Sequence, residues 1–294
     1  MTIIAGFKCN EGLVVCADTQ ETVGAVKRHV PKLRYEDLMP SPAMSALGGT
    51  SHPNSDMAVA FCGAANNGPF IDKLVDCAWR EAQTANDLEE ACEAIEESIK
   101  DSYRQFGRIY QRGYCPEAEL IFGVKMGGRS KLFYALGPVV NEKDGYSAGG
   151  VGIYMADFLA SRMYSRYLHL SQCLVLAAYV LFQAKEHVEG CGGRSEIAIL
   201  RNEGTSGRIN WKHTETITNL LKLADRETGR ILVDYANIAL RDEEFVEAGT
   251  KTLTNIMSAR QQERENLKQW NDFWQALTKG KPFVDELGLP NKLI

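Results

Sequence analysis

The chain opens on Met1-Thr-Ile-Ile-Ala-Gly-Phe-Lys-Cys-Asn10-Glu-Gly12-Leu-Val-Val-Cys-Ala-Asp18. Two apolar runs flank a turn at Asn10-Glu-Gly12, a pattern that predicts a β-hairpin. A hairpin places the first residues of one strand beside the last residues of its partner. The opening stretch therefore brings Thr2 and Asp18 to the same end of a two-stranded ribbon.

The loop length sets the register of this hairpin. With a three-residue loop and Gly12 at positive φ, Cys9 faces Leu13. In that register Thr2 and Asp18 point to the same face as diagonal neighbours about 7–8 Å apart. One lysine ammonium between them can touch both, whereas a slip of one residue puts them on opposite faces.

Thr2 is a candidate nucleophile because of its position. Initiator methionine is generally removed when the next residue is small, so loss of Met1 gives Thr2 a free α-amine beside its own hydroxyl. The amine, with a reference pKa of about 7.7–8.0, can take the hydroxyl proton at neutral pH. A nearby lysine lowers the pKa of both groups, and Asp18 holds that lysine charged and in place.

The opening is followed by further motifs in a fixed order. They are Leu13 to Thr19, Thr22, Gly24, Val30-Pro-Lys32, Ala60 to Ala65, Ala118 to Val124 and Tyr146 to Gly152. Together with Thr2 to Phe7, this order resembles proteasome β-type subunits and bacterial proteasome-like peptidases, members of the N-terminal nucleophile (Ntn) hydrolase superfamily. The resemblance extends to about His213.

The resemblance assigns roles residue by residue. It implies Thr2 as nucleophile, Lys32 as the lysine that tunes it, Asp18 as the partner of that lysine, and the Gly63 N–H as the oxyanion hole. Substrate-binding positions are Thr22, which pairs with a bound peptide's backbone, and Glu21, Phe61 and Ala65, which line the first specificity pocket. The acid at 21 favours basic side chains, while the large ring at 61 makes the pocket shallow, so no single specificity follows.

Two positions depart from the family pattern. Gly150 stands where active proteasome subunits usually carry a serine that helps to orient the terminal amine, and Ser147 lies three residues earlier. Cys191 replaces the serine of a second family motif. The aspartate of that motif has no clear counterpart among three nearby candidates, Glu186, His187 and Glu189. These departures weaken the prediction of proteolysis more than that of a nucleophile.

The pattern of elements predicts an α+β protein. Residues 1–213 form the four-layer αββα sandwich of the Ntn hydrolase type that the resemblance implies. The expected elements are strands at 58–62, helices after Pro69 and Asp87, a hairpin of 120–126 with 131–136 around Gly127-Gly128, helices at 153–166 and 171–187, and strands at 196–200 and 208–213. Residues 38–54 are expected to be a loop, and 214–294 a helical extension. Near its end lies an apolar face of Leu267, Trp270, Phe273, Trp274 and Leu277.

Composition excludes several classes of function. A net charge of −5 over 294 residues, without a basic run, argues against a nucleic-acid partner. The longest apolar run, Cys173 to Phe182, is too short to span a membrane. Eight cysteines without a C-x-x-C pair, in a chain with no visible signal peptide, indicate reduced thiols and a cytoplasmic protein. Neither a metal nor a cofactor is predicted.

The sequence therefore predicts a threonine-type hydrolase, with peptides or unfolded proteins as substrates and an acyl-enzyme on Thr2. The resemblance implies a homo-oligomeric ring or spiral, and a separate ATPase cap would supply any ATP-driven unfolding, because the chain has no P-loop. Three alternatives remain: a transpeptidase or amidohydrolase acting on other amides, a non-catalytic assembly subunit that keeps Met1, and an α/β-hydrolase whose nucleophile elbow is Gly145-Tyr-Ser147-Ala-Gly149.

Overall fold

The computed structural model describes residues 2–23, 26–38, 56–65, 68–109, 116–236 and 241–266. It divides into two compact units, Met1–Ile209 and Asn210–Ile294. Two expected features lie outside the described residues. One is the loop of 38–54, of which only Leu38 is described, and the other is the apolar face of 267–277.

The first unit is built on two five-stranded sheets in which every neighbouring pair is antiparallel. The first sheet has the order β10 (Tyr146–Gly150), β1 (Ile3–Cys9), β2 (Gly12–Asp18), β11 (Ser195–Arg201), β12 (Gly207–Arg208). The second has the order β5 (Leu33–Asp37), β6 (Ala58–Ala65), β7 (Ala118–Met126), β8 (Arg129–Leu136), β9 (Val139–Lys143). A separate ribbon joins β3 (Gln20–Val23) to β4 (Val26–His29).

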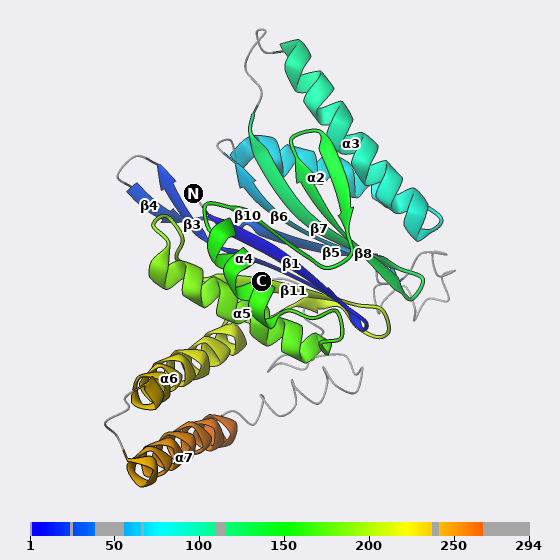
Figure 1. Cartoon of the computed structure of the whole chain (residues 1–294). Helices are drawn as coiled ribbons and strands as arrows, with labels where there is room; N and C mark the ends of the chain where they lie inside the picture. The colour runs from blue at the N-terminus through cyan, green and yellow to red at the C-terminus, as the bar shows by residue number, and fades with distance from the viewer. Residues whose placement is uncertain are drawn as a thin grey trace. The chain divides into compact units, whose positions relative to one another are not determined.

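Helices cover the outer face of each sheet (Figure 1). Helices α2 (Gly68–Ala82) and α3 (Leu88–Ile109) contact the second sheet, and α4 (Ile153–Met163) and α5 (Leu170–His187) contact the first. One apolar cluster, which includes Ile4, Val15, Ala60, Ile121 and Leu132, fills the space between the sheets. A second cluster lies between the second sheet and its helices. The unit is thus a mixed α/β structure, and its buried residues include these two apolar clusters.

Several local expectations are confirmed, each by an identifiable local cause. Pro69 lies in the first turn of α2, where its missing N–H costs nothing. Asp87 caps α3, its Oδ1 accepting the Glu90 N–H at 2.9 Å. The tight turn between β7 and β8 depends on Gly127 and Gly128, whose φ angles are 60° and 73°.

The predicted register of the opening hairpin is wrong by one residue. The turn contains two residues, Asn10 and Glu11, so Cys9 pairs with Gly12 and Ile4 with Ala17. Gly12 does have positive φ, at 146°. A positive φ at Gly12 is therefore compatible with both a two-residue and a three-residue turn, and it does not determine the register.

Two further expectations need correction. The strand predicted to run to His213 ends at Arg208, and a helix begins at Trp211, because the Asn210 side chain accepts the Lys212 N–H at 2.9 Å. Strands β9 and β10 were not expected, since residues 141–150 are mostly glycine and polar residues, and β-branched residues occur within 139–150 at Val139 and Val140 alone.

The second unit is helical over its described residues. It contains α6 (Trp211–Ala236) and α7 (Asp242–Asn266), which contact each other. The rings of Tyr235 and Phe245 lie 5.9 Å apart where the two helices approach. Within the described ranges of the whole chain, no helix is long and apolar enough to cross a membrane.

Gly6 gives a test of how tightly the two sheets pack. A Cβ at this position would lie 2.7 Å from Leu132 Cδ1 and 2.8 Å from Ile121 Cγ2. We expect Gly6→Ala to lower the free energy of unfolding by about 1–3 kcal/mol, the usual cost of overpacking a core. Gly207→Ala is the control, because nothing lies within 4 Å of its Cβ position. Equal effects of the two substitutions in urea unfolding would contradict the packing described.

Candidate active site

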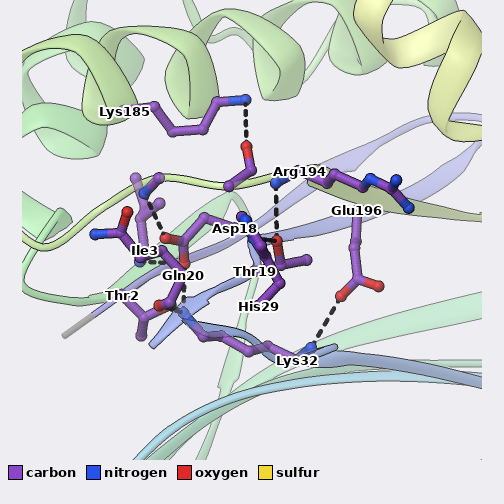
Figure 2. Close-up of polar contacts among 12 residues, drawn as sticks. Thr2, Ile3, Asp18, Thr19, Gln20, His29, Lys32, Lys185, Arg194 and Glu196 are labelled. Carbon is purple, nitrogen blue, oxygen red and sulfur yellow. Dashed lines mark hydrogen bonds and ion pairs between the residues drawn. The ribbon is translucent and has the colours of Figure 1, made fainter. Parts of the chain in front are cut away.

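Thr2, Asp18 and Lys32 meet at one end of the two sheets, and their side chains converge in Figure 2. Thr2 precedes β1, Asp18 ends β2, and Lys32 precedes β5. The Thr2 hydroxyl donates to Asp18 Oδ1. Lys32 Nζ donates to Thr2 Oγ1 at 2.5 Å and to Asp18 Oδ1 at 2.8 Å. Three of the four residues with predicted catalytic roles are therefore in direct contact.

This contact does not arise from the register first predicted. In the observed register, Thr2 and Asp18 belong to opposite faces of the ribbon. They meet because Thr2 precedes the hydrogen-bonded ladder and Asp18 Oδ1 also accepts the Ile3 N–H, at 3.2 Å. The carboxylate thus reaches across the end of the strand.

The charges at this site are buried and fully hydrogen-bonded. Asp18 is 0% exposed, and its second oxygen accepts the Gly192 N–H at 2.8 Å. Lys32 uses its third proton on the backbone oxygen of Gln20. Buried ion pairs persist only when further hydrogen bonds offset the loss of water. The ammonium is therefore fixed where it can stabilise negative charge that develops on Thr2 Oγ1.

The Gly63 N–H, predicted to form the oxyanion hole, already has a partner. It donates to the carbonyl of Lys32 at 3.2 Å. A side chain at this position would collide with Ile71, because a Cβ would lie 2.9 Å from Ile71 Cδ1. To bind an oxyanion, the N–H has to exchange or share this long bond.

The four predicted substrate-binding residues lie on two strands, two on β3 and two on β6. Glu21 pairs with Arg28 Nε at 2.5 Å, so its charge is already neutralised. Thr22 Oγ1 is buried and has no hydrogen-bond partner among the residues that the structure describes. Phe61 is 1% exposed and faces the helices, with its ring 5.7 Å from that of Phe122, and Ala65 packs against the same core.

Gly150 adjoins Thr2, whereas Ser147 does not. Gly150 pairs with Ile3 and has a φ of 75°, a conformation that disfavours serine. A Cβ there would also lie 3.0 Å from Thr2 Cγ2. Ser147 is buried inside β10 opposite Gly6. It therefore lies within an antiparallel strand and not on the strand-to-helix turn of a nucleophile elbow.

Cys191 lies close enough to this site to interact electrostatically with it. Burial, and to a smaller extent the charge of Asp18, raise the pKa of its thiol to about 12, while the charge of Lys32 opposes the rise. The thiol is therefore neutral at physiological pH. The three nearby candidates for the missing aspartate, Glu186, His187 and Glu189, are exposed.

Three contributors were missed by the sequence analysis. The Gln20 carbonyl and the Gly192 N–H are backbone groups, which carry no signal in a residue pattern. Glu196, which contacts the Lys32 backbone, does leave a signal: it is a charged residue at an inward position of the apolar strand β11.

Comparison with known proteins identifies solved structures with a similar fold. No family model and no curated protein sequence matches the chain. Among solved structures, an Anbu (Gly-1) mutant from Hyphomicrobium sp. strain MC1 aligns with a TM-score of 0.60 at 14% identity, covering 82% of this chain and 100% of that one. Anbu (ancestral β-subunit) from Yersinia bercovieri gives 0.59 at 12%, covering 82% and 99%. The helical assembly of the Anbu complex from Pseudomonas aeruginosa gives 0.59 at 11%, covering 78% and 95%. At this identity the likeness shows that the chain shares the Anbu fold.

The buried ion pair can be tested by removing its charges singly and together. We expect Asp18→Asn to lower the free energy of unfolding by about 3–5 kcal/mol, because the Lys32 ammonium, 10% exposed, loses its counter-charge. Asp18→Asn with Lys32→Met should cost clearly less, since no charge stays buried. If the double variant loses as much stability as the two single variants combined, measured by urea unfolding, the pair is not coupled.

The raised pKa of Cys191 predicts low reactivity. At pH 8 a thiol with a pKa of about 12 is ionised to roughly one part in 10⁴. We expect iodoacetamide to label the half-buried Cys77 in the native protein and to spare Cys191, as peptide mapping can show. Folding raises this pKa from 9.0, so the folded protein holds the thiol proton more tightly than the unfolded chain does. The free energy of unfolding is therefore unaffected by this group below pH 9 and falls as the pH rises towards 12. Equal labelling of both cysteines at pH 8 would contradict the burial described.

Proposed function

We propose that this chain is a threonine-type Ntn hydrolase that cleaves peptide bonds through an acyl-enzyme on Thr2, after removal of Met1. The observation that carries the proposal is the position of Thr2 Oγ1, which contacts both the Lys32 ammonium and the Asp18 carboxylate. The arrangement of two sheets between helices supports assignment to the four-layer αββα sandwich of this superfamily. The shared fold with Anbu structures supports it further.

The chemistry follows from the groups present. The free amine of Thr2, with a reference pKa of about 7.7–8.0, takes the hydroxyl proton as Oγ1 attacks the substrate carbonyl. Lys32 stabilises the developing alkoxide, and the Gly63 N–H turns from the Lys32 carbonyl to the oxyanion. The amine then passes its proton to the leaving nitrogen. Water, deprotonated by the same amine, attacks the ester; the amine returns the proton to Oγ1 as the C–O bond breaks, which releases the carboxylic acid and regenerates Thr2.

The wider setting of this activity is part of the same proposal. Residues 1–213 form the hydrolase core and 214–294 a helical extension. Peptides or unfolded proteins are the substrates, and copies of the chain assemble as a ring or spiral, with a separate ATPase for folded substrates. One Anbu complex is described as a helical assembly, which favours self-association here.

A second candidate function is a non-catalytic assembly subunit. Two observations favour it: the Gly63 N–H is engaged by the Lys32 carbonyl, and the φ of Gly150 disfavours the serine found at this position in active proteasome subunits. In this case Met1 stays on the chain. The two functions therefore differ in a measurable mass.

The deciding experiment is the intact mass of the purified protein before and after treatment with a threonine-directed epoxyketone. We expect the wild type to lack Met1 and to take one adduct. Thr2→Ala should be processed but take none, and Thr2→Ser should react more slowly than the wild type. Thr216→Ala, which changes a half-buried threonine on α6, is the control and should react like the wild type.

Peptide hydrolysis provides the second readout. We expect Thr2→Ala to reduce the turnover of fluorogenic peptides by at least about 10³-fold, as loss of a nucleophile does in other hydrolases. A wild-type chain that keeps Met1 and takes no adduct would overturn the catalytic proposal in favour of the assembly subunit. An adduct that persists in Thr2→Ala would assign the nucleophile to another residue.

A further inference from the structure

Lys32 is held at its backbone as well as at its ammonium group. Glu196 Oε2 accepts the N–H of Lys32 at 2.9 Å (Figure 2). It also accepts the N–H of Leu33 at 3.0 Å. The other carboxylate oxygen, Oε1, accepts from Arg208 Nη2 at 2.6 Å. Both oxygens of Glu196 are therefore engaged, one by the backbone before β5 and one by a guanidinium on β12.

This carboxylate links the two sheets. Glu196 lies on β11 of the first sheet, one residue beyond Ser195, which pairs with Asp18. Leu33 begins β5 of the second sheet, and Lys32 directly precedes it. The contact thus ties the strand that pairs with Asp18 to the segment that carries its lysine partner. The Glu196 side chain is only 10% exposed, so water competes little for these bonds.

The rest of the Lys32 backbone is also fixed. Its carbonyl accepts the Gly63 N–H, the group that the proposed reaction needs for the oxyanion. If that bond is exchanged during the reaction, the N–H side of Lys32 becomes its remaining backbone anchor. A charged acceptor makes a stronger anchor than a neutral one, because hydrogen bonds to an ionised group are about twice as strong.

We propose that Glu196 is a positioning residue: it anchors the Lys32 backbone so that the ammonium stays in contact with both Thr2 Oγ1 and Asp18 during the reaction. The inference rests on the proposed function. A buried carboxylate at an inward position of an apolar strand costs desolvation, and positioning of Lys32 accounts for its presence here. Arg208 orients Glu196 in turn and offsets its charge.

The test measures covalent inactivation by the epoxyketone, which separates binding (KI) from the chemical step (kinact). We expect Glu196→Ala to lower kinact by about 10- to 100-fold, because small misplacements of reacting groups have effects of this size, and to leave KI within about threefold. Glu196→Gln should keep kinact within about threefold, since its amide oxygen can accept both N–H groups. Glu89→Ala, which removes an exposed carboxylate paired with Arg129, is the control and should match the wild type.

A purely structural role would not produce this pattern. Unchanged kinact in folded Glu196→Ala, or an equal loss in the Ala and Gln variants, would overturn the inference. If Glu196→Ala does not fold, Arg208→Ala takes its place, because it frees the Glu196 carboxylate without removing it. We then expect kinact to fall about 3- to 10-fold, and an unchanged value overturns the inference. An unreactive wild type would instead refute the proposed function, so the two failures are distinguishable.

Discussion

The buried pair of Asp18 and Lys32 is the interaction on which the rest of the site depends. Asp18 belongs to the first sheet and Lys32 directly precedes the second, and neither side chain is well solvated by bulk water. Each proton of the ammonium and each oxygen of the carboxylate therefore needs a partner from the surrounding chain. Those partners, the Gln20 carbonyl, the Gly192 N–H and Thr2, are what the neighbouring loops and strand ends supply.

Such a pair requires the two sheets to hold a fixed separation and register. Glycines make close approach possible: Gly6 faces Leu132 and Ile121, and the Cβ position of Gly123 lies 2.7 Å from Leu13 Cδ1. The same close packing lets Glu196 reach from the first sheet to the backbone of the second. The distance between the two sheets thus determines both how the core packs and how the residues of the site are placed.

Much of the fold could be predicted from caps and turns, which depend on residues close in sequence. Contacts between residues far apart in sequence could not be predicted in this way. The Asp87 cap, the Gly127-Gly128 turn and the α4 and α5 helices could be predicted because their causes lie within a few residues. The trio of Thr2, Asp18 and Lys32 was predictable from a family resemblance. The hairpin register was not, because Gly12 suits both loop lengths. Neither the direction of Phe61 towards the helices nor the contact of Glu196, 164 residues from Lys32, leaves a periodic signal that identifies its partner.

The hydrogen bonds around the first peptide units bear on how such a protein would mature. The Thr2 carbonyl accepts the Gly152 N–H at 3.2 Å, and the Ile3 N–H donates to Asp18. Both bonds lie on the C-terminal side of the Thr2 α-carbon, so neither is broken when Met1 is cleaved off. Activation would then consist of uncovering one nitrogen within an already assembled site. Unlike a zymogen that must reorganise a loop, this precursor would differ from its mature form in the position of its terminal amine.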